Sequence, residues 1–115
     1  MKKLLSVIAL FALCSIAQGA ELTCFGTEPF WGAEISRNKI SINDFDKTIT
    51  EKVHHKRSAA GTTEGYNDVY QTRNMTIVTK LTNNCNDGMS DNIFEYDVTL
   101  ITKTKVLTGC CTKKH

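Results

Sequence analysis

Two adjacent histidines, His54 and His55, are the side chains best suited to acid–base chemistry in this chain. They fall near the end of a predicted strand, where neighbouring side chains point to opposite faces of a sheet. One of them could act as a general base, but no serine or cysteine stands in a recognisable nucleophile elbow. Solvent-exposed histidines at the edge of a loop account for the pair without catalysis.

Paired carboxylates are the second candidate for chemistry. The pairs Asp44/Asp46 and Asp87/Asp91 occur in segments rich in turn residues. Aspartate is favoured in turns because its side chain hydrogen-bonds to its own backbone, so catalysis is not needed to explain these pairs. Since no nucleophile–base pair is visible, we expect the protein not to be an enzyme and to need no cofactor.

A calcium loop is the third candidate, suggested by the run NNCNDG at 83–88. Cys85 stands where such a loop requires an oxygen ligand, and no glutamate closes a loop of twelve residues. We expect a turn held by a disulfide here. The alternative is a calcium ion bound by Asp87, Ser90, Asp91 and backbone carbonyls.

The most distinctive apolar feature is the run GTEPFW at 26–31. Phe30 and Trp31 could form a surface on which a ligand stacks, or Trp31 could plug one end of a barrel. We favour core packing, because a domain this small needs its only tryptophan inside. Pro29 would break strand pairing and separate the first two strands.

The first twenty residues differ from the rest of the chain. Lys2 and Lys3 precede an apolar run of ten residues at 4–13, and small and polar residues follow at 15–20. This order is typical of a secretory signal peptide, and the apolar run is well short of the ~20 residues that a membrane-spanning helix needs. We therefore predict a cleaved signal at 1–20 and a single soluble domain at 21–115, periplasmic or secreted.

The signal is expected to be cut after Gly19, with Ala17 and Gly19 at the small-residue positions, or alternatively after Ala20. Lipidation of Cys14 is a second possible route of export. It would require a small residue before the cysteine, and Leu13 is bulky. Soluble export is therefore preferred.

The mature chain carries no net charge. Without Lys2 and Lys3 it has 12 basic and 12 acidic side chains, and its basic residues cluster only at 54–57 and 113–115. Nucleic acid is therefore not expected as a partner. The remaining 95 residues fit one small domain, which buries a limited fraction of its surface and gains from crosslinks.

Period-two alternation replaces helical periodicity in the mature segment. Short runs rich in Thr, Ile, Val and Tyr are separated by Asn, Asp and Gly, which is typical of strands and tight turns. About eight such runs predict an antiparallel barrel or sandwich, of which we favour an all-β, lipocalin-like barrel. Strands are expected at 21–26, 30–36, 39–43, 47–54, 66–73, 75–81, 93–102 and 105–111.

Four cysteines remain after signal cleavage, namely Cys24, Cys85, Cys110 and Cys111. An even number in an exported domain of this size predicts two disulfides. A zinc site assisted by a histidine is the alternative, but zinc ligands usually occur as C-x-x-C or H-x-x-x-H pairs. Because Cys110 and Cys111 are adjacent, they do not suit one metal, and we expect disulfides without a bound metal.

Two motifs taken together resemble a known family. The run GTEPFW at 26–31 is followed later by CNDGMSD at 85–91, by Tyr96 and by Gly109–Cys110. This combination resembles a family of uncharacterised bacterial exported proteins and lipoproteins that show G-x-E-P-F-W, C-x-D-x-M-S-D and a closing G-C. The chain is more distantly similar, in architecture, to inhibitors of C-type lysozyme. Candidate binding or structural residues in these motifs are Glu28, Phe30, Trp31, Met89, Ser90 and Asp91.

The family pattern implies a disulfide between Cys85 and Cys110, which would tie the loop at 89–91 to the last strand. If the first and last strands are neighbours, as closure of a barrel requires, Cys24 can meet Cys111. Adjacent residues of a strand face opposite sides, so Cys110 and Cys111 would have different partners. The crossed pairing, Cys24 with Cys110 and Cys85 with Cys111, stays open at this point.

For function, we expect a non-enzymatic, exported protein of the cell envelope that binds either a protein or a small ligand, with no membrane span in the mature chain. The second hypothesis is a periplasmic inhibitor of C-type lysozyme, in which a loop at 58–65 or 89–91 would occupy the cleft of the hydrolase. An open apolar cavity beside Trp31 would favour a small ligand, whereas a filled core would favour loops and protein partners.

Overall fold

The computed structural model describes residues 21–27, 29–44 and 47–114, which form nine β-strands and no helix. The predicted signal peptide at 1–20 lies outside the described residues. The expected all-β antiparallel architecture is confirmed. Among the residues described, there is no helix with the length and hydrophobicity of a membrane span. The strands are β1 (Leu22–Thr27), β2 (Phe30–Ile35), β3 (Lys39–Asp44), β4 (Lys47–Lys52), β5 (His55–Ser58), β6 (Asn67–Gln71), β7 (Thr76–Cys85), β8 (Phe94–Ile101) and β9 (Val106–Lys113).

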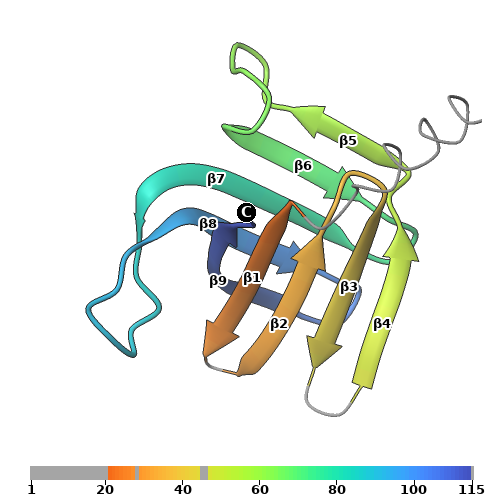
Figure 1. Ribbon diagram of the computed structural model, residues 1–115. Helices are drawn as coiled ribbons and strands as arrows, with labels where there is room; N and C mark the ends of the chain where they lie inside the picture. Colours follow the sequence, from red (N-terminus) through yellow and green to blue (C-terminus); the bar gives the residue numbers. More distant parts are fainter. Residues whose placement is uncertain (1–20, 28, 45–46, 115) are drawn as a thin grey trace, which may run out of the picture.

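All nine strands belong to one antiparallel sheet, which curls into a half-barrel (Figure 1). The strand order is β4-β3-β2-β1-β9-β8-β7-β6-β5, so the first and last strands of the chain are paired at its centre. Short turns join most of the neighbouring strands, as the spacing of Asn, Asp and Gly predicts.

The two ends of the sheet, β4 and β5, follow each other directly in the chain. The chain bends between them: the N–H of Val53 donates to the carbonyl of Asn38 at 2.7 Å, and the N–H of His54 donates to that of Gln71 at 2.8 Å. One extended run therefore pairs first with β3 and then with β6. We expected about eight strands, and β5 is the additional one, because its sequence HKRS has no apolar alternation to reveal it.

Side chains of β3 and β4 contact the β6–β7 and β8–β9 turns across the opening of the curl. Glu51 accepts hydrogen bonds from Thr72 Oγ1 and Asn74 Nδ2, each at 2.6 Å, and Lys105 Nζ lies 2.7 Å from Asp44 Oδ2. The bonds from Asn74 and then Thr72 lower the pKa of Glu51 below its usual value, because they stabilise the ionised carboxylate. On this side of the half-barrel, contacts between polar side chains take the place of the backbone hydrogen bonds that close a complete barrel.

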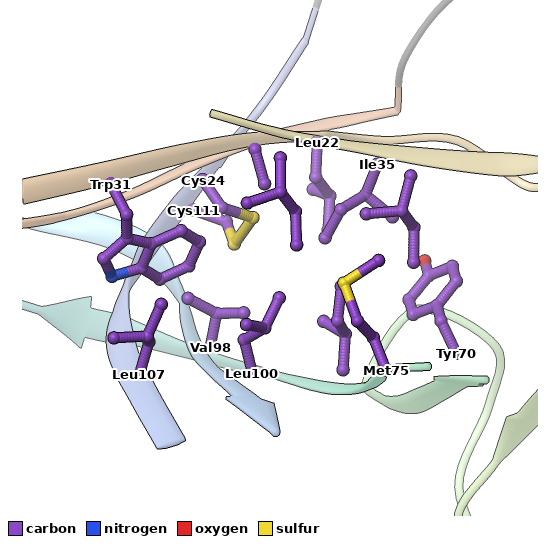
Figure 2. Close-up of a cluster of buried hydrophobic side chains, with 14 of the residues drawn as sticks. Leu22, Cys24, Trp31, Ile35, Tyr70, Met75, Val98, Leu100, Leu107 and Cys111 are labelled. Atoms are coloured by element: carbon purple, nitrogen blue, oxygen red, sulfur yellow. A yellow bond between two sulfur atoms is a disulfide. The ribbon is translucent and has the colours of Figure 1, made fainter. Parts of the chain in front are cut away.

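The concave face of the sheet holds the hydrophobic core, since alternate residues of β1, β2, β3, β6, β7, β8 and β9 point into it. Core side chains fill the curl from Trp31 at one end to Tyr70 at the other, with the Cys24–Cys111 disulfide between them (Figure 2). Trp31 is 5% exposed and packs among the side chains of this cluster. The buried core residues are Leu22, Cys24, Trp31, Ala33, Ile35, Ile40, Ile42, Tyr70, Met75, Ile77, Tyr96, Val98, Leu100, Leu107 and Cys111.

Strand β9 carries one disulfide on each of its faces. Cys111 bonds to Cys24, which lies directly opposite it on β1, and both belong to the core. Cys110 points to the convex face and bonds to Cys85 at the end of β7. The two predicted disulfides are thus present, in the pairing that the family pattern and the strand order implied and not in the crossed one.

Two glycines allow the close approach of β1 to its neighbours. A Cβ atom at Gly109 would overlap the backbone carbonyl of Phe25 on β1, and one at Gly26 would overlap the indole ring of Trp31. The indole Nε1 donates to the carbonyl of Thr108 at 3.2 Å. Trp31 therefore lies across the β1–β9 pair, and both glycines are required by packing rather than by turns.

The close β1–β9 approach can be tested by adding one methyl group. Gly109→Ala should lower the free energy of unfolding by at least about 2 kcal/mol, because the backbone of β1 has to move. The matched control is Gly32→Ala, whose Cβ would have its nearest contact at 3.8 Å, the carbonyl oxygen of Cys24. It should be neutral or stabilising by up to about 1 kcal/mol. Denaturant unfolding of both variants would measure this, and equal stabilities would refute the packing account.

Candidate functional site

The connection between β7 and β8, residues 86–93, is a loop that extends beyond the sheet (Figure 1). The side chain of Asn86 organises it: its Oδ1 accepts from the N–H of Gly88 at 2.7 Å, and its Nδ2 donates to the carbonyls of Ser90 and Asn92 at 2.9 and 3.1 Å. Gly88 has φ 82°, which glycine adopts without strain. The loop is thus internally bonded even though it contributes nothing to the core cluster.

The loop is also anchored to the convex face of the sheet at both of its ends. The Cys85–Cys110 disulfide joins the residue before it to β9. The ring of Phe94, directly after it, packs edge-on against Phe25 of β1, with centroids 4.8 Å apart. These contacts lie on the opposite side of β1 and β9 from the core, so they form a small second packing site whose role is to hold the loop.

A hydrogen bond from a side chain to the backbone joins the loop to the β1–β2 turn. Thr27 Oγ1 donates to the carbonyl of Asp87 at 3.0 Å, and Thr27 pairs with Phe30 across the β1–β2 ladder. The exposed fractions of Phe30, Met89 and Ile93 are 60%, 65% and 53%. We call these three residues, with Asp87 and Asp91, the loop face. Residues 86–93 contain two aspartates and no lysine or arginine, so the loop face is apolar and acidic.

The residues predicted as site candidates divide into two groups. Trp31 is a core residue, as core packing predicted. Phe30, Met89, Ser90 and Asp91 are exposed, and Glu28 lies outside the described residues. The two motifs therefore meet at one end of the half-barrel, where their glycines, cysteines and tryptophan hold the sheet together and their remaining side chains face solvent.

The remaining candidates for chemistry are the carboxylates of the loop and the two histidines. In the part of the chain that the structure describes, no three His, Cys, Asp or Glu side chains gather as a metal site would require. Asp87 Oδ1 instead accepts a hydrogen bond from the N–H of Met89 at 2.9 Å, as in an Asx turn. His54 and His55 are both exposed, and only His55 lies in a strand.

Sequence reasoning missed a second feature, a charged cavity at the opposite mouth of the half-barrel. Its volume is about 390 Å³, and its floor includes Tyr70 and Tyr96. Lys56 of β5 points inward here, with Nζ 5.4 Å from the centre of the Tyr70 ring. Burial, and then the carboxylate of Glu21, raise the pKa of the Tyr70 phenol well above its usual value, so this hydroxyl stays protonated.

No signal in the sequence marks this cavity. Lys56 and Asp68 occupy inward positions of β5 and β6, where alternation predicts apolar residues. Glu21, Arg37 and Glu64 come from segments outside the strands. The cavity is assembled by the bend between β4 and β5, which was not predicted.

Comparison with known proteins identifies no relative: no family model, no curated protein and no solved structure matches this chain. The candidate sites therefore rest on their own geometry.

Removing the outer disulfide should release the loop while leaving the sheet folded. Replacing Cys85 and Cys110 with alanine should cost about 3.5 kcal/mol in the chain-entropy model. Amide hydrogen exchange at 86–93 should become much faster, whereas β1 and β2 keep their relative protection. Replacing Cys24 and Cys111 is the matched control: it should cost about 4.6 kcal/mol without selectively loosening the loop. Unchanged exchange at 86–93 in the first variant would show that the disulfide does not order it.

Proposed function

We propose that the mature protein is an exported, non-enzymatic binding domain of the cell envelope, and that the loop face is its recognition surface. One observation carries this proposal. The chain uses a disulfide, an aromatic pair and the hydrogen bond from the Thr27 hydroxyl to hold a loop that contributes nothing to the core cluster. Because core packing does not explain why this loop is ordered, binding is the more usual explanation for such a loop.

Preorganisation is the physical advantage of such an anchor. Binding costs free energy when loops and side chains lose freedom at an interface, so a loop fixed beforehand loses less. Exposed apolar side chains gathered at one end of a domain favour association with another surface. The packing of Trp31 within the core cluster supports recognition by the loops rather than inside the barrel.

The partner that fits this surface is a protein with an apolar patch bordered by basic residues. Phe30, Met89 and Ile93 supply apolar contacts, and Asp87 and Asp91 supply negative charge without a neighbouring cation in the loop. Complementary charge accelerates encounter and selects among partners. Two disulfides support an oxidising compartment, in agreement with export to the periplasm or the medium.

Photo-crosslinking inside the producing bacterium tests this proposal. A benzophenone amino acid placed at position 89 should give a discrete adduct with an envelope protein. The same probe at position 106 is the control, because Val106 is equally exposed, at 62%, on a different hairpin. Charge reversal by Asp91→Lys should weaken the adduct at position 89. No adduct at 89, or the same adduct at both positions, would contradict a binding role for the loop face.

Inhibition of C-type lysozyme is a second candidate function. The observation that favours it is the projection of 86–93 beyond the sheet as an ordered loop, the shape that insertion into a hydrolase cleft requires (Figure 1). The exposed Met89, Ser90 and Asp91 would then be the inserted residues.

A turnover assay decides this second candidate. At micromolar concentration the protein should slow cell-wall hydrolysis by a C-type lysozyme, and Met89→Asp should abolish the effect while Val106→Asp preserves it. If the wild-type protein leaves the hydrolysis rate unchanged, lysozyme is excluded as the partner. The crosslinking experiment would still test the loop face independently.

A further inference from the structure

We propose that the charged cavity at the mouth of the half-barrel is a binding site for a small carboxylate, and that Glu64 occupies its anion position in the free protein. The cavity is separate from the loop face, since β1 begins at the cavity with Leu22 and ends at Thr27 beside the loop. Its volume of about 390 Å³ is in the range of small-molecule sites.

The ammonium group of Lys56 is the fixed centre of this site. Its side chain is only 14% exposed and lies against the ring of Tyr70. Asp68, 2% exposed, is 3.9 Å from Lys56 Nζ. Asp68 is already engaged elsewhere, accepting from Ser58 Oγ at 2.7 Å and from the N–H of Gly65 at 2.9 Å. Asp68 thus supports the wall of the cavity and leaves the short contact of Lys56 to another carboxylate.

Glu64 supplies that short contact from a position that it can leave. Its carboxylate lies 2.8 Å from Lys56 Nζ and 3.6 Å from an Arg37 Nη atom, yet its side chain is 61% exposed. It belongs to the connection between β5 and β6, which turns through Gly61 and Gly65 at φ 84° and 94°. A carboxylate held between a lysine and an arginine at the entrance of a cavity marks the position that a ligand carboxylate would take.

The charges around the cavity favour an anion once Glu64 moves aside. Lys56, Arg37 and Lys113 line it against the two remaining carboxylates of Glu21 and Asp68, whereas Lys114, which also lines it, has its ammonium 3.3 Å from Glu34. Charge-assisted hydrogen bonds from lysine and arginine are the strong contacts for a carboxylate. The tyrosine floor gives the carbon skeleton of the ligand an apolar surface.

Binding of succinate, followed by backbone amide NMR on the disulfide-bonded protein, tests this proposal. Succinate should cause saturable shifts of the amides of Gly65, Lys56 and Tyr70, and neutral succinamide should not. Glu64→Gln should tighten succinate binding by about tenfold, because the ligand no longer competes with an internal carboxylate. Lys56→Met keeps the aliphatic stem on Tyr70 but removes the charge, and it should abolish the shifts.

Lys105→Met provides the matched control. Lys105 also forms a close ion pair, 2.7 Å from Asp44, but at the other opening of the curl, so its loss should leave succinate binding unchanged. The spectrum of each variant also reports whether it is folded. The proposal is overturned if neither wild type nor Glu64→Gln shows saturable shifts, if folded Lys56→Met still binds, or if inorganic phosphate binds this site more tightly than succinate.

Discussion

The pairing of β1 with β9 is the interaction on which the rest of the structure depends. It joins the first and last of the described strands at the centre of the sheet, and Cys24 and Cys111, 87 residues apart, are bonded within it. Without it the sheet would separate into β4-β3-β2-β1 and β9-β8-β7-β6-β5. Each part would expose an unpaired edge and lose the surface that covers its core face. The absence of side chains at Gly26 and Gly109 is what lets the strands come this close.

Neighbouring side chains of β9 point to opposite faces of the sheet, so this strand holds structure in place on both faces. Leu107 and Cys111 face the core, while Cys110 faces outward and receives the disulfide from β7. The loop at 86–93 is therefore fixed to the same strand that completes the core, but on the side where nothing needs to be covered. Because the two roles lie on opposite faces, side chains of the loop can vary without disturbing the core, whereas Cys110 and Gly109 cannot.

Much of this arrangement could be predicted from the sequence, because it follows from the alternation of apolar and polar residues along the strands. Phe94, Tyr96, Val98 and Leu100 indicated β8, although Phe94 proved to face the convex side. The adjacent cysteines, combined with period two, predicted that they would serve different partners. The bend at 53–54 could not be predicted in this way, since β5 is held by long-range pairing with β6 and not by any local pattern. The charged cavity depends on that bend and was missed with it.

The two ends of β1 differ in a way that stability alone does not explain. At one end Met89 and Ile93 are exposed although apolar, and at the other Asp68 is buried and Lys56 is only 14% exposed although both are charged. An apolar pair in place of buried charges is often neutral or stabilising, and polar residues in place of exposed apolar ones would favour solubility. Residues whose polarity does not match their burial are found mainly at functional sites. That both occur in one small domain, at opposite ends of the strand that closes it, favours two recognition surfaces sharing one rigid support.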